Sequence, residues 1–288
     1  MSIKSLKTPL RYPGGKSKAI KTLSQWYPKN ISEYREPFIG GGSIAIDITK
    51  SNPDIPVWIN DLYVPLYNFW VHLRDNGEEL SERILELKQS TLDEGDKDKV
   101  TAKAKELFNK YKEEIDTYDD FEKSVAFFVM NKCSFSGLTE NSTFSQTASN
   151  SNFSLVGAKK LKDFSKIIKN WKITNIDYSE VMSADGSDDT FIFLDPPYDI
   201  KDFLYGKNRE IHRSFDHDLF AEHVYKCDHT FMITYNQNHK LMLLYQDYEL
   251  NFWNLRYSMA HRDDNVKTEL LIPNYNINPV SPLEKLLA

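Results

Sequence analysis

The chain has 288 residues, which is enough for about two domains and a sizeable hydrophobic core. Its composition, 40% hydrophobic with 11 glycines and 12 prolines, excludes a fibrous repeat and wholesale disorder. The net charge of −6 argues against a nucleic-acid partner. However, residues 1–35 carry eight basic side chains and one acidic, and residues 156–172 carry six and one. Such segregation can form a basic face on an acidic protein, although a solvated helix face explains the second cluster as well.

No apolar run approaches the ~18 residues of a membrane span, and the first residues lack a signal-peptide pattern. We therefore expect a soluble, cytoplasmic protein. The two cysteines, Cys133 and Cys227, lie far apart and without metal-ligand spacing. They predict a reducing compartment and no metal site. Nothing in the pattern decides between a monomer and a weak dimer.

The first glycine turn is at residues 11–17, RYPGGKS, and leads into an amphipathic run over 18–26. A phosphate-binding loop of the form G-x-x-x-x-G-K-[ST] would need glycine at position 10, which is Leu10. What remains is a turn that offers backbone N–H groups and one lysine, Lys16, near the start of a helix. This arrangement suits an anion such as a carboxylate, and a plain structural turn explains it equally well.

A second glycine turn, residues 40–43, follows the expected end of a strand and precedes an apolar-periodic run over 44–48. The next expected strand, 55–59, leads to Asn60 and Asp61, which places a carboxylate 19 residues past Gly42. An acid at the end of the second strand of such a unit can accept hydrogen bonds from a ribose diol. The pattern therefore predicts an adenosine-containing cofactor, either NAD-like or S-adenosylmethionine.

Between residues 66 and 133 the pattern becomes helical, with helix-period segments over 78–88, 100–115 and 121–130. We expect a mainly helical domain, 63–155, inserted between two parts of a catalytic domain, 1–62 and 156–288. Residues 134–154 are rich in Ser, Thr and Asn, with phenylalanines spaced through them. They are either a flexible linker or a loop whose side chains touch bases, and composition favours the linker slightly.

Alternation of strands and helices resumes after residue 156. We expect helices over 158–170 and 216–226, and strands over 171–176, 190–194, 230–234, 248–253 and 268–272. This alternation predicts a doubly wound α/β fold.

The strand over 190–194 ends at Asp195-Pro196-Pro197-Tyr198. Neither proline can donate to a sheet ladder, so Asp195 should lie at the carboxyl end of a strand, where ligands bind in open α/β sheets. The prolines also remove two N–H groups, so this corner presents a carboxylate and free carbonyls. We interpret it as an acceptor site for an N–H donor.

These motifs together resemble the Dam-like DNA adenine-N6 methyltransferases, the D12 class, alpha group. The resemblance rests on residues 11–16, 36–43, 60–61, 195–198 and 267–275, which follow the family's order over nearly the whole chain. It implies a seven-stranded, Rossmann-like methyltransferase sheet and S-adenosyl-L-methionine as cofactor, with S-adenosyl-L-homocysteine as product. It also implies a helical target-recognition domain with a DNA-contacting loop or hairpin at about 132–154, and double-stranded DNA as partner.

The resemblance assigns roles by position. Tyr12 and Lys16 would hold the methionine end of the cofactor, Phe38 would line its site, and Asp61 would accept from the ribose. The further cofactor residues implied are Gly15, Gly40, Gly42, Ser43, Asp177, Tyr178 and Asp195. The catalytic residues implied are Asp195, Pro196, Pro197 and Tyr198.

The implied DNA-contacting residues are Lys132, Phe135, Ser136, Glu140 and Asn141. Relatives that methylate GATC carry arginine where Glu140 stands. Arginine donates to guanine, whereas glutamate can only accept, for instance from cytosine N4. The predicted target therefore differs from GATC.

The chemistry expected is methyl transfer to N6 of a flipped-out adenine, with Asp195 and the Pro196 carbonyl accepting the amino hydrogens and Tyr198 stacking on the base. The same corner fits any exocyclic amino group, so a cytosine-N4 or RNA methyltransferase is an alternative. More remote alternatives are an NAD-dependent oxidoreductase, which leaves Asp195 unexplained, and a DNA-binding protein without catalysis.

Overall fold

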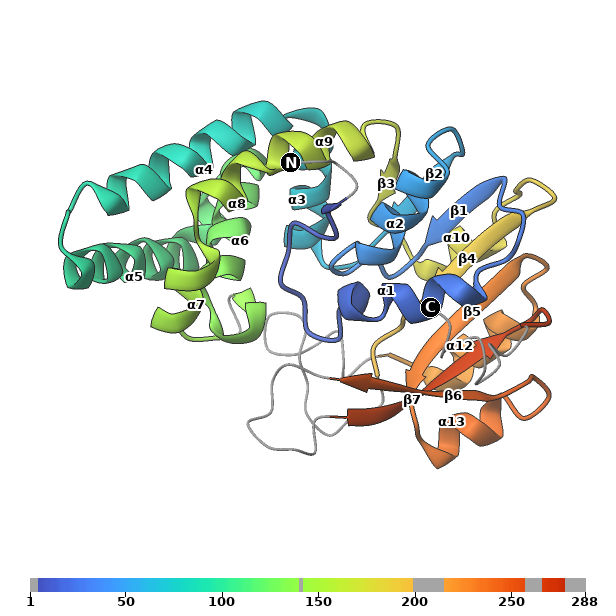
Figure 1. The fold of residues 1–288 in the computed structure, drawn as a ribbon. Helices are drawn as coiled ribbons and strands as arrows, with labels where there is room; N and C mark the ends of the chain where they lie inside the picture. The colour runs from blue at the N-terminus through green and yellow to red at the C-terminus, as the bar shows by residue number, and fades with distance from the viewer. Residues whose placement is uncertain (1–4, 140–141, 199–214, 257–265, 278–288) are drawn as a thin grey trace, which may run out of the picture.

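The computed structural model describes residues 5–139, 142–198, 215–256 and 266–277. Its strands form one seven-stranded sheet in the order β3-β2-β1-β4-β5-β7-β6 (Figure 1). The five strands β1 to β5 run parallel to one another, and β7 lies antiparallel between β5 and β6. The strands are β1 Glu33–Glu36, β2 Val57–Asn60, β3 Lys172–Thr174, β4 Thr190–Leu194, β5 Thr230–Asn236, β6 Asn251–Arg256 and β7 Val266–Pro273.

Helices cover both faces of this sheet, because its central strands carry apolar side chains on both faces. In β4, Phe191 and Phe193 join one hydrophobic cluster, whereas Ile192 and Leu194 join a second on the opposite face. The second cluster is closed by α10 (Tyr178–Ser183), α12 (His217–Tyr225) and α13 (His239–Leu244). The first is covered by α1 (Ile20–Leu23), α2 (Ser43–Ser51), α3 (Val64–Asp75) and α9 (Leu161–Ile168). The doubly wound prediction is confirmed.

The remaining helices lie to one side of the sheet, at the left of Figure 1. They are α4 (Gly77–Leu92), α5 (Lys97–Glu114), α6 (Asp120–Cys133), α7 (Gln146–Asn152) and α8 (Leu155–Lys159). Buried side chains of α3, α4 and α6 belong to the same hydrophobic cluster as Phe191 of the central strand. The helices thus share a core with the sheet, and their role as an inserted target-recognition domain stays a prediction.

The linker interpretation of residues 134–154 is wrong. Ser134 and Phe144 form an antiparallel bridge, a 3-10 helix spans 135–137, and α7 follows. Phe153 is only 1% exposed. Two of the serines that suggested flexibility act as helix caps. Ser145 accepts the N–H of Ala148 at the start of α7, and Ser154 accepts the N–H of Gly157 at the start of α8.

Several expected boundaries also differ. The helix expected over 158–170 is two helices, α8 and α9, because Lys160 ends the first and begins the second. Strand β2 begins at Val57, after Pro56, rather than at residue 55. Strand β6 begins at Asn251 rather than 248, because Tyr248 packs against Tyr225 with 5.1 Å between ring centroids. Among the described residues, none of the helices has the length and apolarity that crossing a membrane requires.

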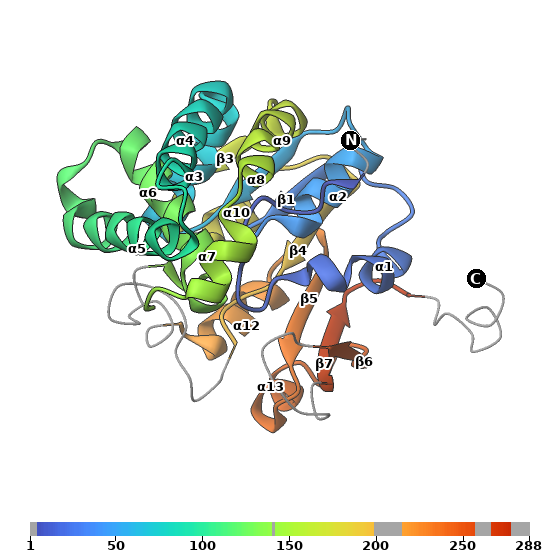
Figure 2. The same cartoon turned by 60° about the vertical axis from the view of Figure 1, so that its left-hand side comes forward.

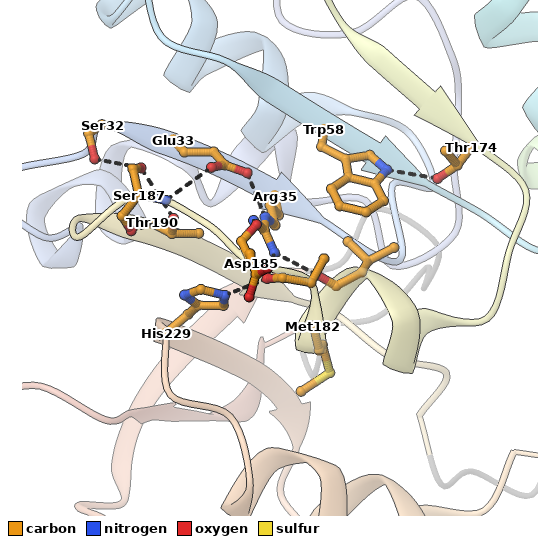
Figure 3. A network of polar contacts seen from close by, with 12 residues as sticks. Ser32, Glu33, Arg35, Trp58, Thr174, Met182, Asp185, Ser187, Thr190 and His229 are labelled. Carbon is orange, nitrogen blue, oxygen red and sulfur yellow. Dashed lines mark hydrogen bonds and ion pairs between the residues drawn. The ribbon is translucent and has the colours of Figure 1, made fainter.

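A buried polar network surrounds Arg35 of β1, towards the amino ends of β4 and β5 (Figure 3). The guanidinium donates to Glu33 at 2.6 Å and to the backbone carbonyls of Val181, Ala184 and Asp185 at 2.9, 2.7 and 2.6 Å. His229 makes a hydrogen bond of 2.9 Å to the same Ala184 carbonyl. Arg35 therefore ties β1 to the end of α10.

Candidate active site

The sheet has a switch point between β1 and β4, where the chain turns away in opposite directions from neighbouring parallel strands. The loop after β1 carries Gly40 and Gly42, and the corner after β4 carries Asp195. In doubly wound sheets, ligands bind outside the carboxyl ends of the strands at this point. The two motifs that the sequence places 155 residues apart, Gly40 and Asp195, thus flank one position of the sheet.

Asp195 is held by a buried lysine. Lys16 Nζ lies 2.7 Å from Oδ1 and 2.6 Å from Oδ2 of Asp195, and it also donates to the Gly14 carbonyl at 3.0 Å. Thr234, near the end of β5, donates its hydroxyl to Oδ1 at 2.8 Å. Lys16 is 2% exposed, whereas the Asp195 side chain is 20% exposed. The carboxylate therefore already accepts N–H and O–H donors and still reaches the surface.

Lys16 reaches Asp195 because its turn packs on the glycine loop. The Gly15 N–H donates to the Tyr12 carbonyl at 3.0 Å and closes the turn. The Tyr12 ring covers the glycine loop so closely that a Cβ on Gly40 would lie 2.8 Å from its Cε1. The two glycine motifs expected to bind different ends of one cofactor are in direct contact.

Gly42 begins helix α2 in a left-handed conformation, with φ of +67°. A Cβ at this position would lie 2.6 Å from the Trp70 ring, so both the backbone angle and the available space require glycine. Trp70 in α3 also donates its indole N–H to the Gly40 carbonyl at 3.2 Å. Ser43 follows as the first residue of α2 and is buried.

Asp61 lies beside this loop, after β2. Its Oδ2 accepts the Gly40 N–H at 3.1 Å, and its Oδ1 accepts the Tyr63 N–H at 3.0 Å. Burial raises the pKa of Asp61 to about 6, while these two N–H donors act in the opposite direction. Each oxygen accepts one backbone hydrogen bond and can accept another from a further donor. The carboxylate expected to meet the ribose is thus fixed against the glycine loop.

Phe38 and Tyr178 form one aromatic group, with ring centroids 5.4 Å apart. The Tyr178 hydroxyl makes a hydrogen bond of 3.0 Å to His223 Nδ1. Asp177 is exposed and caps α10 by accepting the Ser179 N–H at 2.9 Å. Phe38, Asp177 and Tyr178 therefore lie together.

Tyr198 lies between Lys16 and strand β7. Lys16 Nζ is 5.1 Å from the centroid of its ring, and its hydroxyl donates to Glu269 Oε2 at 2.6 Å. Glu269 is 1% exposed. Pro196 and Pro197 connect Tyr198 to Asp195, so the predicted catalytic residues form one corner.

Four residues of the site were not predicted as such: Asn60, Thr234, Glu269 and Glu36. Asn60 donates to the carbonyls of Pro37 and Ile176 at 3.1 and 3.0 Å, and so ties together the ends of β1, β2 and β3. Glu36 is buried and accepts the Tyr34 hydroxyl at 2.7 Å, and burial raises its pKa to about 8. For Glu269, the sequence did offer an indication of a role in the site, because a charged residue interrupts an otherwise apolar strand.

The predicted DNA-contacting residues do not all lie together. Phe135 is 56% exposed, and Ser136 beside it has φ of +55°. Lys132 instead points inward: its Nζ donates to the Pro9 carbonyl at 2.6 Å, and burial lowers its pKa to about 7. Glu140 and Asn141 lie outside the described residues.

The basic cluster of residues 156–172 is partly neutralised by the helices around it. Lys162 pairs with Glu78 and Glu82 of α4 at 3.0 and 2.9 Å, and Lys166 lies 3.8 Å from Asp163. These contacts favour the solvated-helix interpretation of that cluster. In the part of the chain that the structure describes, no group of three or more His, Cys, Asp and Glu side chains is placed to hold a metal ion.

The sheet order and the polar residues at its switch point define a doubly wound α/β protein. The chain matches the model of the D12 class N6 adenine-specific DNA methyltransferase family over residues 12–259, and it belongs to that family. The family resemblance is thereby confirmed. A membership of this kind also sets aside the NAD-dependent oxidoreductase alternative.

Curated relatives support the same family. The chain is 26% identical over 200 residues to the type II methyltransferase M.MjaIII of Methanocaldococcus jannaschii, covering 66% of this chain and 68% of the relative. It is 24% identical over 199 residues to the type II methyltransferase M1.LlaDCHI of Lactococcus lactis subsp. cremoris, covering 65% and 64%. For the modification methylase StsI of Streptococcus sanguinis, the identity is 25% over 203 residues, covering 68% of this chain and 29% of the relative.

Proposed function

We propose that the chain is a site-specific enzyme that transfers a methyl group from S-adenosyl-L-methionine to N6 of an adenine flipped out of duplex DNA. The observation that carries this proposal is the Asp195 carboxylate, which accepts an ammonium and a hydroxyl at the switch point, beside a glycine loop. An exocyclic amino group is an N–H donor of the same kind. Membership of the D12 class supports adenine as the base.

The residues present fit the cofactor. Asp61 supplies a carboxylate for the ribose hydroxyls, and the glycine loop allows close approach of a ligand to the backbone. Phe38 and Tyr178 supply aromatic surface for adenine. Lys16 supplies a cation for the methionine carboxylate. Bound S-adenosylmethionine would provide the electrophilic methyl group.

The role of Asp195 follows from the chemistry of the adenine amino group, whose lone pair is delocalised into the ring. Asp195 and the Pro196 carbonyl accept its two hydrogens, which brings the nitrogen towards tetrahedral geometry and frees the lone pair for attack. A new N–C bond forms as the C–S bond breaks, and Asp195 is placed to take the proton that the nitrogen then loses. Acceptors aimed at the developing positive charge lower the barrier.

In the structure, the ammonium of Lys16 lies at Asp195, where the amino group of the base is proposed to bind. Its ammonium donates to both oxygens of Asp195 and lies over the ring of Tyr198, the two groups proposed to hold the target base. A base that enters between them therefore displaces Lys16, and the carboxylate of the bound cofactor is the alternative partner. Stacking on Tyr198, at ~1–3 kcal/mol per base, offsets much of the cost of flipping.

The test is transfer of labelled methyl from S-adenosylmethionine to unmethylated duplex DNA, followed by digestion and separation of the nucleosides. We expect label in N6-methyladenine, and at least about 100-fold less of it with Asp195→Ala. Asp188→Ala, an exposed aspartate just before the start of the same strand, is the matched control and should retain activity. Wild-type turnover in Asp195→Ala would remove the assigned role.

Cytosine-N4 methylation is the second candidate, because the acceptor corner at Asp195 fits either amino group. The same digestion separates the two candidates, since label would then appear in N4-methylcytosine. For the recognition sequence, we propose a site other than GATC, because Glu140 accepts where an arginine would donate.

A further inference from the structure

Asn131 in the last turn of α6 holds the segment that leads to Lys16. It is 0% exposed. Its Oδ1 accepts the Arg11 N–H at 2.9 Å, and its Nδ2 donates to the Arg11 carbonyl at 2.6 Å and to the Gly137 carbonyl at 3.2 Å. One buried amide thus binds both backbone groups of Arg11 and, at the same time, the end of the 3-10 helix at 135–137.

Further contacts join the same two segments. The Arg11 guanidinium donates to the Ser134 carbonyl at 2.9 Å, and Lys132 donates to the Pro9 carbonyl at 2.6 Å. A Cβ on Gly137 would lie 2.3 Å from the Arg11 carbonyl oxygen, so the backbones are in contact. In Figures 1 and 2 the amino-terminal segment, drawn in dark blue, runs between α7 and the sheet. The two segments therefore form one tightly bonded unit.

Each end of this unit leads to a different part of the site. Arg11 precedes Tyr12, which packs on Gly40, and the turn that follows presents Lys16 to Asp195. At the other end, the exposed Phe135 lies between Ser134 and Gly137, the two residues whose carbonyls are bonded. These hydrogen bonds form a continuous path from the segment that carries Phe135 to the segment that carries Tyr12 and Lys16.

We propose that Asn131 is a positioning residue that couples binding of DNA at Phe135 to binding of the cofactor at Tyr12 and Lys16. This inference rests on the proposed function, since it presumes both ligands. Coupling of two sites is reciprocal: if DNA tightens cofactor binding by some factor, the cofactor tightens DNA binding by the same factor. Couplings of this kind typically amount to about 5- to 150-fold.

The experiment measures the affinity for S-adenosyl-L-homocysteine by calorimetry, with and without unmethylated genomic DNA fragments made by amplification. In the wild type we expect DNA to change the dissociation constant by at least about 5-fold. Asn131→Ala should reduce this change to less than about 2-fold, because the two segments then move independently. Lys132→Met removes the hydrogen bond to Pro9 and the cation–π contact with Phe128, keeps the hydrogen bonds of Asn131, and should give an intermediate value.

Asn274→Ala, at an exposed position, is the control. The Asn274 side chain also bonds two backbone groups: it accepts the Phe231 N–H and donates to the His229 carbonyl, both at 2.8 Å. These groups lie at the amino end of β5, whereas the site lies at the carboxyl ends of the parallel strands. It should lower the melting temperature and leave the coupling at its wild-type value. A loss of coupling in this control would show that general destabilisation causes the effect, and would overturn the assignment.

The kinetics give a second measurement. Asn131→Ala should raise the KM for S-adenosylmethionine at saturating DNA more than it lowers kcat, because Lys16 is misplaced while Asp195 stays on its strand. If Asn131→Ala does not fold, Lys132→Met carries the test, and wild-type coupling in Lys132→Met then overturns the inference. Methyl transfer with unchanged coupling in Asn131→Ala overturns it while leaving the proposed function intact. A wild-type protein that binds no S-adenosylhomocysteine overturns the proposed function itself.

Discussion

Two buried cations lie in this sheet region, and they are bonded in different ways. Arg35 donates to three backbone carbonyls and to Glu33, all fixed by the fold (Figure 3). Lys16 donates to both carboxylate oxygens of Asp195, whose side chain is 20% exposed, and to the Gly14 carbonyl. Backbone partners cannot leave, whereas a partly exposed carboxylate can exchange one donor for another. The difference separates a cation that stabilises the fold from one that a ligand can displace.

The largest effect expected from this comparison is on stability. Arg35→Met should lower the free energy of unfolding by about 3–5 kcal/mol, because Glu33 and the carbonyls of Val181 and Asp185 lose the guanidinium as their donor, while the Ala184 carbonyl keeps only His229. Urea denaturation measures the loss. Activity per folded molecule should be unchanged, since the guanidinium of Arg35 bonds Glu33, Val181, Ala184 and Asp185, which lie outside the site. A variant with normal stability would show that the network contributes nothing net.

Lys16→Met should show the opposite pattern. We expect kcat/KM for methyl transfer to fall about 10- to 100-fold, the equivalent of one charged hydrogen bond at about 1.5–3 kcal/mol. Unfolding in urea should change less than in Arg35→Met, because water can reach Asp195. If the two variants lose stability equally, the distinction between the two cations fails.

Glu36, the neighbour of Arg35 in β1, provides a test that depends on pH. Burial raises the pKa of Glu36 from 4.5 to about 8, so the folded state holds its proton more tightly than the unfolded chain. The stability that this proton contributes is complete below pH 4.5 and is lost as pH rises to about 8. Glu36→Gln, which cannot ionise, should therefore gain in melting temperature relative to wild type over this window. A constant difference across the window would contradict the raised pKa.

The smallest effect concerns the hydroxyl of Tyr198. Glu269→Leu removes its acceptor and should lower kcat about 5- to 10-fold, the value of a hydrogen bond worth about 1–1.5 kcal/mol. Glu269→Gln retains an acceptor oxygen and should restore most of the rate. Affinity for S-adenosylhomocysteine should be the same in both variants, and a parallel loss of that affinity would place Glu269 with the cofactor residues instead.

The site could be predicted from sequence where a local rule applies. Pro196 and Pro197 end a strand, so the position of Asp195 followed from their chemistry alone, and the glycine loop followed from Gly40 and Gly42. The family and the seven-stranded fold are confirmed. Thr234 could not be predicted, because it reaches Asp195 only through the pairing of β4 with β5.

Two expectations, one from composition and one from the family resemblance, did not take side-chain packing into account. The Ser- and Asn-rich residues 134–154 suggested a linker, but Ser145 caps a helix and Phe153 is buried. Lys132 was expected at the DNA, yet it lies over the ring of Phe128, 5.1 Å from its centroid. The two are four residues apart on α6, a spacing that places side chains together on a helix and that the sequence does display.

Trp70 has a consequence for how such chains are recombined. Its indole ring takes the space that any side chain at position 42 would need, and it binds the Gly40 carbonyl. A chimera that exchanges the helices of residues 64–152 with those of a relative therefore also replaces Trp70, which packs against the glycine loop. An exchange that leaves the glycine loop intact requires α3 to stay with the sheet, so the productive crossover lies after Trp70.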